Sequence, residues 1–291
     1  MLVDLVQVTA SDQVRLHGAL EVPTDEIRAA QPNPKVDAWL CLHGTGSNFY
    51  AASTLAGITP KLLATGAAVL RANTRGHDII CTGPSAGGHA LQGAAYERVD
   101  EAPLDIAAWI ALLKERGYAR IGLLGHSLGA IKAILALAHE EPANVAALAA
   151  ISPPRLSYSH FVASAHGAGF QKVMDEAVER VNLGRGEELL FVQFPIPYCV
   201  SASGYVDRYG PDEKYNILRL LGRVQCPTLV VYGSTEVQSN VAFRGMPEAV
   251  EELGAGGKWL QTAVVAGADH IYTGCHDSLA AIVNKWVARL G

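Results

Sequence analysis

The sequence predicts an α/β fold in which helices cover both faces of an open, mostly parallel β-sheet. Short apolar runs typical of buried strands alternate with helix-favouring segments over most of the 291 residues. An antiparallel pair of segments rich in β-branched residues comes before this alternation. The alternation pauses between residues 154 and 225, which indicates an insertion that covers one end of the sheet.

Eight segments have the composition of strands. Residues 3–9 and 14–22 flank Ser11-Asp12-Gln13, which predicts two antiparallel strands joined by a short turn. The other six are apolar runs of the kind buried in a parallel sheet: residues 38–42, 67–73, 121–124, 145–151, 228–232 and 259–265.

Helices are expected between these strands. In residues 100–117, apolar side chains recur at helical spacing and Arg116-Gly117 forms a stop signal. We expect loops at residues 24–37, which are rich in proline and charge, and at residues 77–99, which are rich in glycine. The other expected helices are residues 51–65, 130–139, 171–181, 247–253 and 277–290.

The insertion divides the chain into a first core part (1–153), a cap or lid (154–225) and a second core part (226–291). Nine of the twenty aromatic residues of the chain lie in the cap segment. They indicate either a pocket for an apolar or aromatic substrate or packing of the cap against the core.

The composition limits the function classes. The chain is 49% hydrophobic and 18% charged, with a net charge of −5 and no basic cluster, which argues against nucleic acid as a partner. Long apolar stretches and a signal-peptide pattern are missing, so we expect no membrane span and a cytoplasmic location. The five scattered cysteines lack a C-x-x-C motif and predict free thiols without a metal site.

A serine stands where a predicted strand meets a predicted helix, in the motif Gly125-His126-Ser127-Leu128-Gly129. A serine between two glycines at such a turn takes a strained conformation that exposes its hydroxyl group. We therefore predict that Ser127 is a nucleophile. Ser85 lies in a second G-x-S-x-G match, but no helix follows it and the neighbouring proline suits a turn.

A serine nucleophile needs a base, usually a histidine, that is oriented by a carboxylate. Functional groups of an open parallel sheet gather at the carboxyl ends of its strands. Glu236 follows the strand at 228–232 and is the only carboxylate between Glu213 and Glu248, whereas His270 follows the strand at 259–265. The order serine, acid, histidine is typical of hydrolases built on such a sheet.

Two other residues compete for these roles. Asp269 is adjacent to His270, so its side chain should point elsewhere and orient the loop. His276 lies near the start of the last helix, a turn too late to act as the base.

Three motifs together resemble the α/β-hydrolase superfamily: the Ser127 motif, Leu42-His43-Gly44-Thr45-Gly46 and Gly267-Ala268-Asp269-His270. The resemblance covers the chain except the interior of 154–225. It implies the α/β-hydrolase fold and an oxyanion hole formed by the backbone N–H groups of Thr45 and Leu128. Residues 73–77 also resemble the D-x-R-G-H-G stretch of that family, with Asn73 in place of the aspartate and Asp78 in place of the last glycine.

The predicted function is hydrolysis of a small-molecule carboxylic ester through Ser127, His270 and Glu236, with an acyl-enzyme intermediate and no cofactor. Thioester or amide hydrolysis and acyl transfer with the same residues remain open, because the cap decides which leaving group fits. A lyase or C–C bond hydrolase on this scaffold and a ligand-binding receptor also remain open. The oligomeric state is not indicated.

Overall fold

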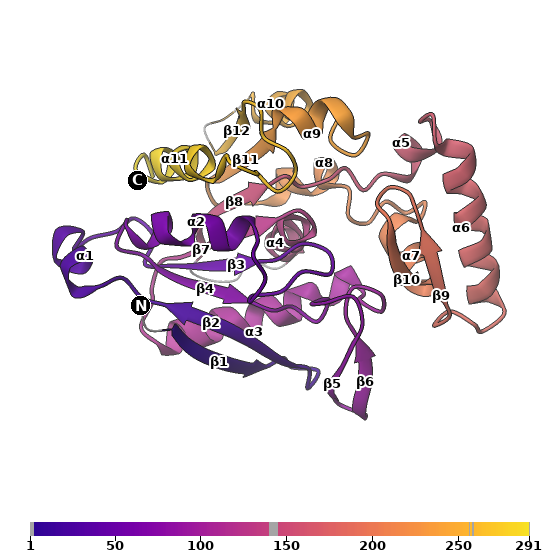
Figure 1. The fold of residues 1–291 in the computed structure, drawn as a ribbon, viewed down its shortest axis with the longest axis horizontal. Helices are drawn as coiled ribbons and strands as arrows, with labels where there is room; N and C mark the ends of the chain where they lie inside the picture. The colour runs from indigo at the N-terminus through magenta and orange to yellow at the C-terminus, as the bar shows by residue number, and fades with distance from the viewer. Residues whose placement is uncertain (1–2, 140–144, 256, 258, 291) are drawn as a thin grey trace.

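A computed structural model describes residues 3–139, 145–255, 257 and 259–290. Its centre is an eight-stranded sheet with the strand order β1-β2-β4-β3-β7-β8-β11-β12 (Figure 1). β1 pairs antiparallel with β2, and β2 with β4, whereas the other neighbours are parallel. The strands are β1 (Val3–Thr9), β2 (Arg15–Glu21), β3 (Ala38–Leu42), β4 (Ala68–Ala72), β7 (Ile121–His126), β8 (Val145–Ile151), β11 (Thr228–Gly233) and β12 (Leu260–Val265). The predicted fold class is confirmed.

The central strands are apolar throughout because both of their faces are covered. In β3, Leu40 and Leu42 pack into one buried cluster, and Trp39 and Cys41 pack into another on the opposite face. This alternation is the two-residue period of a strand. It explains why the sequence of β3 shows a continuous apolar run instead of an apolar–polar pattern.

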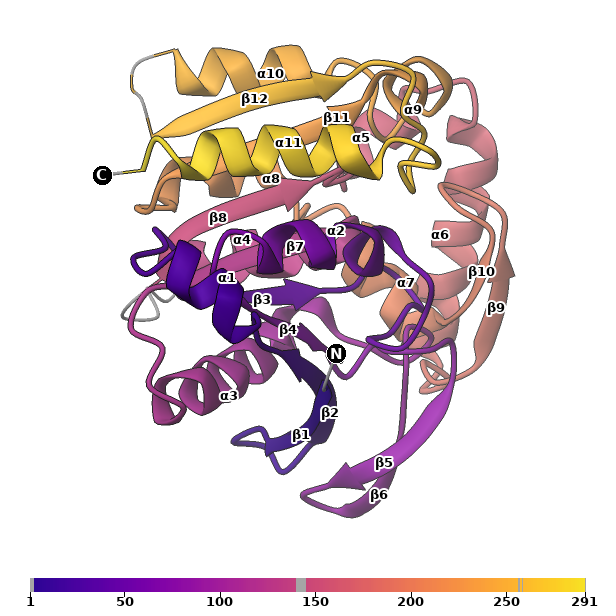
Figure 2. The same cartoon turned by 60° about the vertical axis from the view of Figure 1, so that its left-hand side comes forward.

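Helices lie on both faces of the sheet. On one face, α2 (Thr54–Leu63) and α11 (His276–Val287) contact each other, as Figure 2 shows. On the other face lie α3 (Ala102–Glu115), α4 (Leu128–His139), α8 (Ile217–Leu220) and α10 (Met246–Gly254). The described residues also form the short 3-10 helices η1 (Val99–Glu101) and η2 (Leu221–Arg223).

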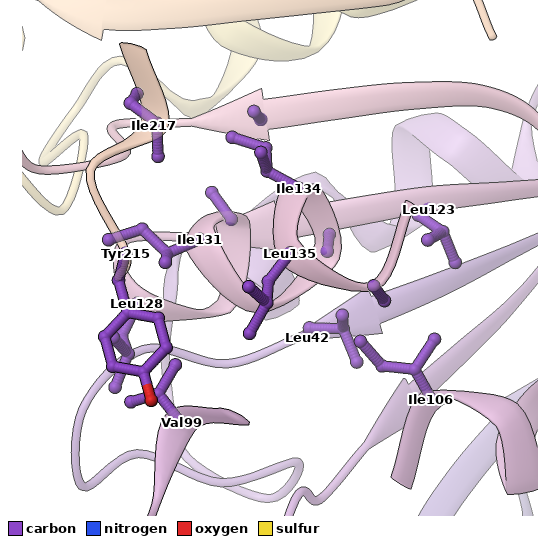
Figure 3. Close-up of a cluster of buried hydrophobic side chains, with 14 of the residues drawn as sticks. Leu42, Val99, Ile106, Leu123, Leu128, Ile131, Ile134, Leu135, Tyr215 and Ile217 are labelled. Carbon is purple, nitrogen blue, oxygen red and sulfur yellow. The ribbon is translucent and has the colours of Figure 1, made fainter. Parts of the chain in front are cut away.

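The helix α4 is buried from Leu128 to Leu137 and forms the centre of the larger core. Its Ile131, Ile134 and Leu135 lie among side chains from the sheet, from α3 and from the segment around α8 (Figure 3). A helix covered on all sides has no polar face, which matches the apolar composition of this stretch.

The segment after β8 forms elements that do not belong to the main sheet and that lie beyond one end of it (Figure 1). These are α5 (Tyr158–Val162), α6 (Gly167–Asn182), the antiparallel hairpin of β9 (Leu189–Val192) and β10 (Tyr198–Ser201), and α7 (Ala202–Tyr209). Phe161 contacts Phe170, Phe194 and Tyr209 with ring centroids 5.3–6.2 Å apart. Much of the aromatic content of this segment therefore packs within the segment itself. The cap boundaries at 154 and 225 stay a prediction.

Two stretches expected to be loops contain regular structure. Residues 24–37 include α1 (Asp25–Ala30), which begins where the Thr24 hydroxyl accepts a hydrogen bond from the Ile27 N–H at 3.4 Å. Residues 77–99 include a hairpin of β5 (Cys81–Ser85) and β6 (Gly88–Gln92). Both elements are short and largely exposed, so they lack the apolar periodicity that reveals buried elements.

Replacing Ile131 with alanine should destabilise the fold strongly, because its side chain is fully buried in the α4 core. We expect the free energy of unfolding to fall by about 2–5 kcal/mol in urea titrations. Leu183→Ala is the matched control, since this side chain is 61% exposed and its loss should cost less than about 0.5 kcal/mol. Equal effects of the two substitutions would contradict the central place of α4.

Candidate active site

Ser127 lies at the sharp turn between β7 and α4 and has a φ angle of 56°. Its backbone N–H donates a hydrogen bond to the Ile151 carbonyl at 2.8 Å, which fixes this left-handed conformation against β8. A Cβ atom at Gly125 would lie 2.3 Å from the Gly129 carbonyl oxygen, so the strand and the helix meet too closely for a side chain. The structure thus contains the strained turn that the motif predicts.

The structure brings Ser127, His270 and Glu236 together. The His270 Nε2 atom lies 3.0 Å from the Ser127 Oγ, and the His270 Nδ1 atom lies 2.7 Å from a Glu236 carboxylate oxygen. His270 stands in the loop after β12, as expected. Glu236 instead lies in the first turn of a short helix, α9 (Ser234–Ser239), which follows β11 directly. Nδ1 can therefore donate to Glu236 while Nε2 accepts the proton of the serine hydroxyl.

The Glu236 carboxylate is buried and has three hydrogen-bond partners. The oxygen that does not face His270 accepts a hydrogen bond from the Gly233 N–H at 2.7 Å and another from the Ser152 hydroxyl. The Ser152 hydroxyl lies 2.9 Å from the Tyr272 hydroxyl. Burial, together with the negative charge of Glu236, raises the pKa of Tyr272, which keeps this phenol neutral.

Sequence reasoning missed both Ser152 and Tyr272. Ser152 carried a usable signal, since it directly follows the strand next to the one that carries Ser127. Its φ angle of 49° also places it at a strained turn. Tyr272 had no such signal, because its ring reaches the site from the loop beyond His270.

The two competing residues have other partners. The Asp269 carboxylate accepts hydrogen bonds from the backbone N–H groups of Ile271 at 3.1 Å and Thr273 at 2.9 Å, so it orients the loop. The Nε2 atom of His276 lies 3.1 Å from the Ile271 carbonyl oxygen. His276 thus also contacts this loop.

Two further histidines adjoin the site and are neutral. Burial lowers the pKa of His126 to about 3, and burial with the nearby charge of Lys132 lowers the pKa of His43 to about 3. The His126 ring lies 4.9 Å from the His270 ring, and its Nε2–H donates to the His270 carbonyl at 2.7 Å. The His43 Nδ1–H donates to the Gly44 carbonyl at 2.8 Å, while its Nε2 accepts a hydrogen bond from the Thr74 N–H. Both rings thus hold backbone segments of the site in place.

The loop after β3 approaches the nucleophile closely. A Cβ atom at Gly44 would lie 2.9 Å from the Ser127 Cβ, so only glycine fits there without a shift. Thr45 and Leu128 both line the pocket that contains Ser127. Within the described residues, neither the Thr45 nor the Leu128 backbone N–H donates a hydrogen bond. Two residues that line the pocket with Ser127 therefore have unused backbone donors.

The pocket has a volume of about 720 Å³. Core and inserted segments both contribute to its walls, which are mainly apolar. The wall residues from the core include Ala52, Ala242, Phe243 and Ile271, and those from residues 154–225 are Pro154, Leu156, Pro195, Ile196, Arg208 and Tyr209.

The model of the alpha/beta hydrolase family matches residues 39–282, most of the chain. The protein belongs to the alpha/beta hydrolase family. Comparison of the sequence with curated proteins finds no match. In the described residues of this hydrolase, no helix is long and apolar enough to cross a membrane.

Solved structures share the fold of this hydrolase at low sequence identity. The alpha/beta hydrolase GrgF from Penicillium sp. has a TM-score of 0.71 at 16% identity, with 100% of this chain and 99% of that chain covered. The Pyrococcus furiosus esterase Pf2001 has a TM-score of 0.63 at 19% identity, with 100% and 92% covered. Est1E from Butyrivibrio proteoclasticus, solved with ferulic acid bound, has a TM-score of 0.65 at 16% identity, with 98% and 99% covered.

In this hydrolase, the stretch that resembles D-x-R-G-H-G connects neighbouring elements through the side chain of Arg75. The Arg75 guanidinium donates to Asp105 at 2.8 Å, to Asp12 at 2.7 Å and to Glu101 at 2.9 Å, which ties the loop after β4 to α3, to the β1–β2 turn and to η1. Asp78, which replaces the last glycine of the motif, has a φ angle of 57°. The aspartate therefore adopts the left-handed backbone conformation that favours glycine.

The depressed pKa of His126 predicts an acid-dependent stability. The unfolded chain binds a proton at His126 below the ordinary pKa of 6.5, whereas the folded protein does so only near pH 3. This contribution to stability is complete above pH 6.5 and is lost as the pH falls towards 3. Urea titrations at several pH values measure the free energy of unfolding. We expect His126→Gln to lower its dependence on pH by about 1.4 kcal/mol per pH unit. If the free energy of unfolding changed with pH equally in wild type and in His126→Gln, a neutral, buried His126 would be contradicted.

Proposed function

We propose that this alpha/beta hydrolase is a serine esterase that cleaves a small-molecule carboxylic ester through Ser127, His270 and Glu236. One observation carries the proposal: hydrogen-bond distances of 3.0 and 2.7 Å link the three side chains in the order that nucleophilic catalysis requires. The unused N–H groups of Thr45 and Leu128 beside the serine support the same conclusion.

In the first half-reaction, the Ser127 oxygen attacks the ester carbonyl while His270 Nε2 takes the hydroxyl proton. The carbonyl oxygen becomes an oxyanion, which accepts hydrogen bonds from the backbone N–H groups of Thr45 and Leu128. Such preorganised donors are worth about 10²–10³ in rate each. The C–O bond to the alcohol then breaks, and His270 returns the proton to the leaving alkoxide oxygen.

In the second half-reaction, His270 takes a proton from water as the water oxygen attacks the acyl-enzyme. The acyl–oxygen bond to Ser127 breaks, the serine regains its proton from His270, and the acid leaves. The Glu236 carboxylate accepts hydrogen bonds from the Gly233 N–H, the Ser152 hydroxyl and the His270 Nδ1–H, which hold it against the imidazole. Its charge stabilises the imidazolium that forms in each half-reaction.

The mainly apolar walls of the pocket favour a substrate with an apolar or aromatic part. Residues 154–225 are proposed to form a cap, since they supply part of the wall. The same three residues would also act on thioesters or amides, or transfer an acyl group to an alcohol, so a substrate panel has to include these compounds. The free thiols of Cys41, Cys81, Cys199 and Cys275 support a cytoplasmic location.

Replacing Ser127 with alanine should abolish ester turnover, because no other hydroxyl is in hydrogen-bond contact with His270 in the described residues. We expect a loss of about 10⁵-fold or more in kcat with p-nitrophenyl esters of short and medium chain length. A fluorophosphonate should label the wild-type protein at Ser127 and leave the variant unlabelled.

Ser85→Ala serves as the control, because Ser85 lies in the β5–β6 hairpin and not at the turn before α4. It should keep both labelling and turnover. Labelling of wild type without turnover of any ester would turn the assignment towards amides, thioesters or acyl transfer. Absence of labelling would overturn the nucleophile itself and favour a ligand-binding receptor.

Glu236→Gln should lower kcat by about 10²–10⁴-fold with little change in KM, because an amide cannot stabilise the imidazolium. The variant keeps nearly the same shape, so its thermal unfolding should stay close to that of wild type. Asp269→Asn is the comparison for the competing carboxylate and should have the smaller effect on kcat. A larger loss of kcat in Asp269→Asn than in Glu236→Gln would contradict the assignment of Glu236 as the acid.

A further inference from the structure

The Glu236 carboxylate faces His270 with one oxygen, while its other oxygen is held by groups that take no part in the proton transfer. A glutamate side chain has several rotatable bonds, so the backbone alone does not fix the plane of its carboxylate. The second oxygen accepts hydrogen bonds from the Gly233 N–H at 2.7 Å and from the Ser152 hydroxyl. Gly233 directly precedes α9, which carries Glu236, whereas Ser152 follows β8. Ser152 thus ties the carboxylate to a neighbouring strand of the sheet.

The backbone around Ser152 is strained and fixed. This residue is fully buried and has a φ angle of 49°, in the left-handed region. Its backbone N–H donates a hydrogen bond to the Val231 carbonyl at 2.7 Å, which holds the turn against β11. Such a conformation persists only where its surroundings maintain it, and strained residues of this kind gather at active sites. Here the strained turn directs the Ser152 hydroxyl towards Glu236.

The hydrogen bonds around Ser152 have one possible direction. A carboxylate only accepts hydrogen bonds, so the Ser152 hydroxyl gives its single proton to Glu236. The contact of 2.9 Å between the Ser152 and Tyr272 hydroxyls therefore needs Tyr272 as the donor. Burial raises the pKa of Tyr272, so the phenol keeps the proton that it donates. A chain of hydrogen bonds thus runs from Tyr272 through Ser152 to Glu236.

Tyr272 belongs to the loop that carries the base. It lies two positions after His270, is fully buried and has a φ angle of 58°. Its backbone N–H donates to the Asp269 carbonyl at 3.2 Å, and the Cys275 N–H donates to the Tyr272 carbonyl at 2.8 Å. The phenol therefore connects the loop of the base with Ser152 at the end of β8.

We propose that Ser152 and Tyr272 are positioning residues of the esterase reaction, because they hold the Glu236 carboxylate against the imidazole of the base. This inference rests on the proposed function. Among the described residues, neither Ser152 nor Tyr272 lines the pocket, so both act through Glu236 and not through the substrate. In each half-reaction the imidazolium forms and disappears, and the carboxylate has to keep its place meanwhile. A buried chain of hydrogen bonds suits this task, since each bond polarises the next.

The kinetic test removes each hydroxyl group separately. Ser152→Ala should lower kcat for p-nitrophenyl esters by about 10–100-fold, the usual range for a hydrogen bond to a charged group. Tyr272→Phe keeps the ring and should lower kcat by about 2–10-fold, the range for a neutral hydrogen bond. KM should stay close to the wild-type value in both variants, since neither side chain lines the pocket. An unchanged kcat in either variant, or an effect confined to KM, would overturn the proposal.

Tyr215→Phe is the matched control for the loss of a buried phenol. The Tyr215 hydroxyl donates to the Asp207 carboxylate at 2.9 Å, and Tyr215 is not among the residues that line the pocket. Its loss should lower the temperature of unfolding at least as much as Tyr272→Phe does, yet leave kcat as in wild type. An equal fall of kcat in Tyr215→Phe and Tyr272→Phe would assign the effect to lost stability and contradict positioning.

A double-mutant cycle tests whether the two residues act through Glu236. In the Glu236→Gln background, Ser152→Ala or Tyr272→Phe should lower kcat by less than about twofold further, because the carboxylate that they hold is already gone. A purely structural role, in which the substitution moves the strand end or the loop, would instead multiply the losses of the single variants. Multiplied losses would therefore rule out positioning through Glu236.

Labelling by a fluorophosphonate separates this inference from the esterase function, because it needs no ester substrate. We expect Ser152→Ala to be labelled at Ser127 about 10–100-fold more slowly than wild type, and Tyr215→Phe to be labelled at the wild-type rate. If wild type is labelled and cleaves esters, an equal labelling rate in Ser152→Ala would overturn the positioning role alone. A wild-type protein that is not labelled would overturn the proposed function itself.

Discussion

The strained backbone at Ser127 is the constraint on which the rest of the structure depends. A residue held in the left-handed region costs about 1–3 kcal/mol and persists only where its surroundings fix it. Here the surroundings are β8, which accepts the Ser127 N–H, and α4, whose apolar side chains fill the core. The packing of α4 stabilises the fold and also holds the serine in place. The stability of the core and the exposure of the serine hydroxyl therefore have the same physical origin.

The parallel sheet brings the other groups of the site to this turn. The segments that follow β3, β8, β11 and β12 all leave the same edge of the sheet, and they supply His43, Ser152, Glu236 and His270. His43, His126 and His270 have separate partners. His43 and His126 donate to backbone carbonyls, whereas His270 contacts a carboxylate and a hydroxyl. Only His270 lies where it can exchange a proton with the serine.

The sequence predicted those parts of the molecule whose signals are local. β-Branched residues around a turn marked β1 and β2, and apolar runs marked the other six strands of the main sheet. The motifs around Ser127 and His270 lie at single strand ends. The position of Glu236 could be predicted because no other carboxylate follows β11 closely. The hairpin of β5 and β6 and the helix α1 could not be predicted, since elements that bury few side chains impose little pattern on the sequence.

The partners of these residues could not be predicted either, because they come from distant parts of the chain. Ser152 reaches Glu236 across 84 positions, and Arg208 reaches Glu97 across 111. A sequence lists charges one by one, whereas the competition of Lys132 and Arg208 for Glu97 exists only in the folded chain. No local pattern contains that competition.

The same buried cluster joins the pocket wall to the loop beside the nucleophile. From Arg208, contacts run through Glu97 to Lys132, whose ammonium group donates to the Thr74 hydroxyl at 2.7 Å. The Thr74 N–H donates to His43, and His43 in turn holds the Gly44 carbonyl directly before Thr45. Since buried polar groups are costly to leave without partners, each link restricts the next. One connected network therefore restricts both Arg208 and the loop that contains Thr45, and it includes residues of α7, α4 and the loop after β3.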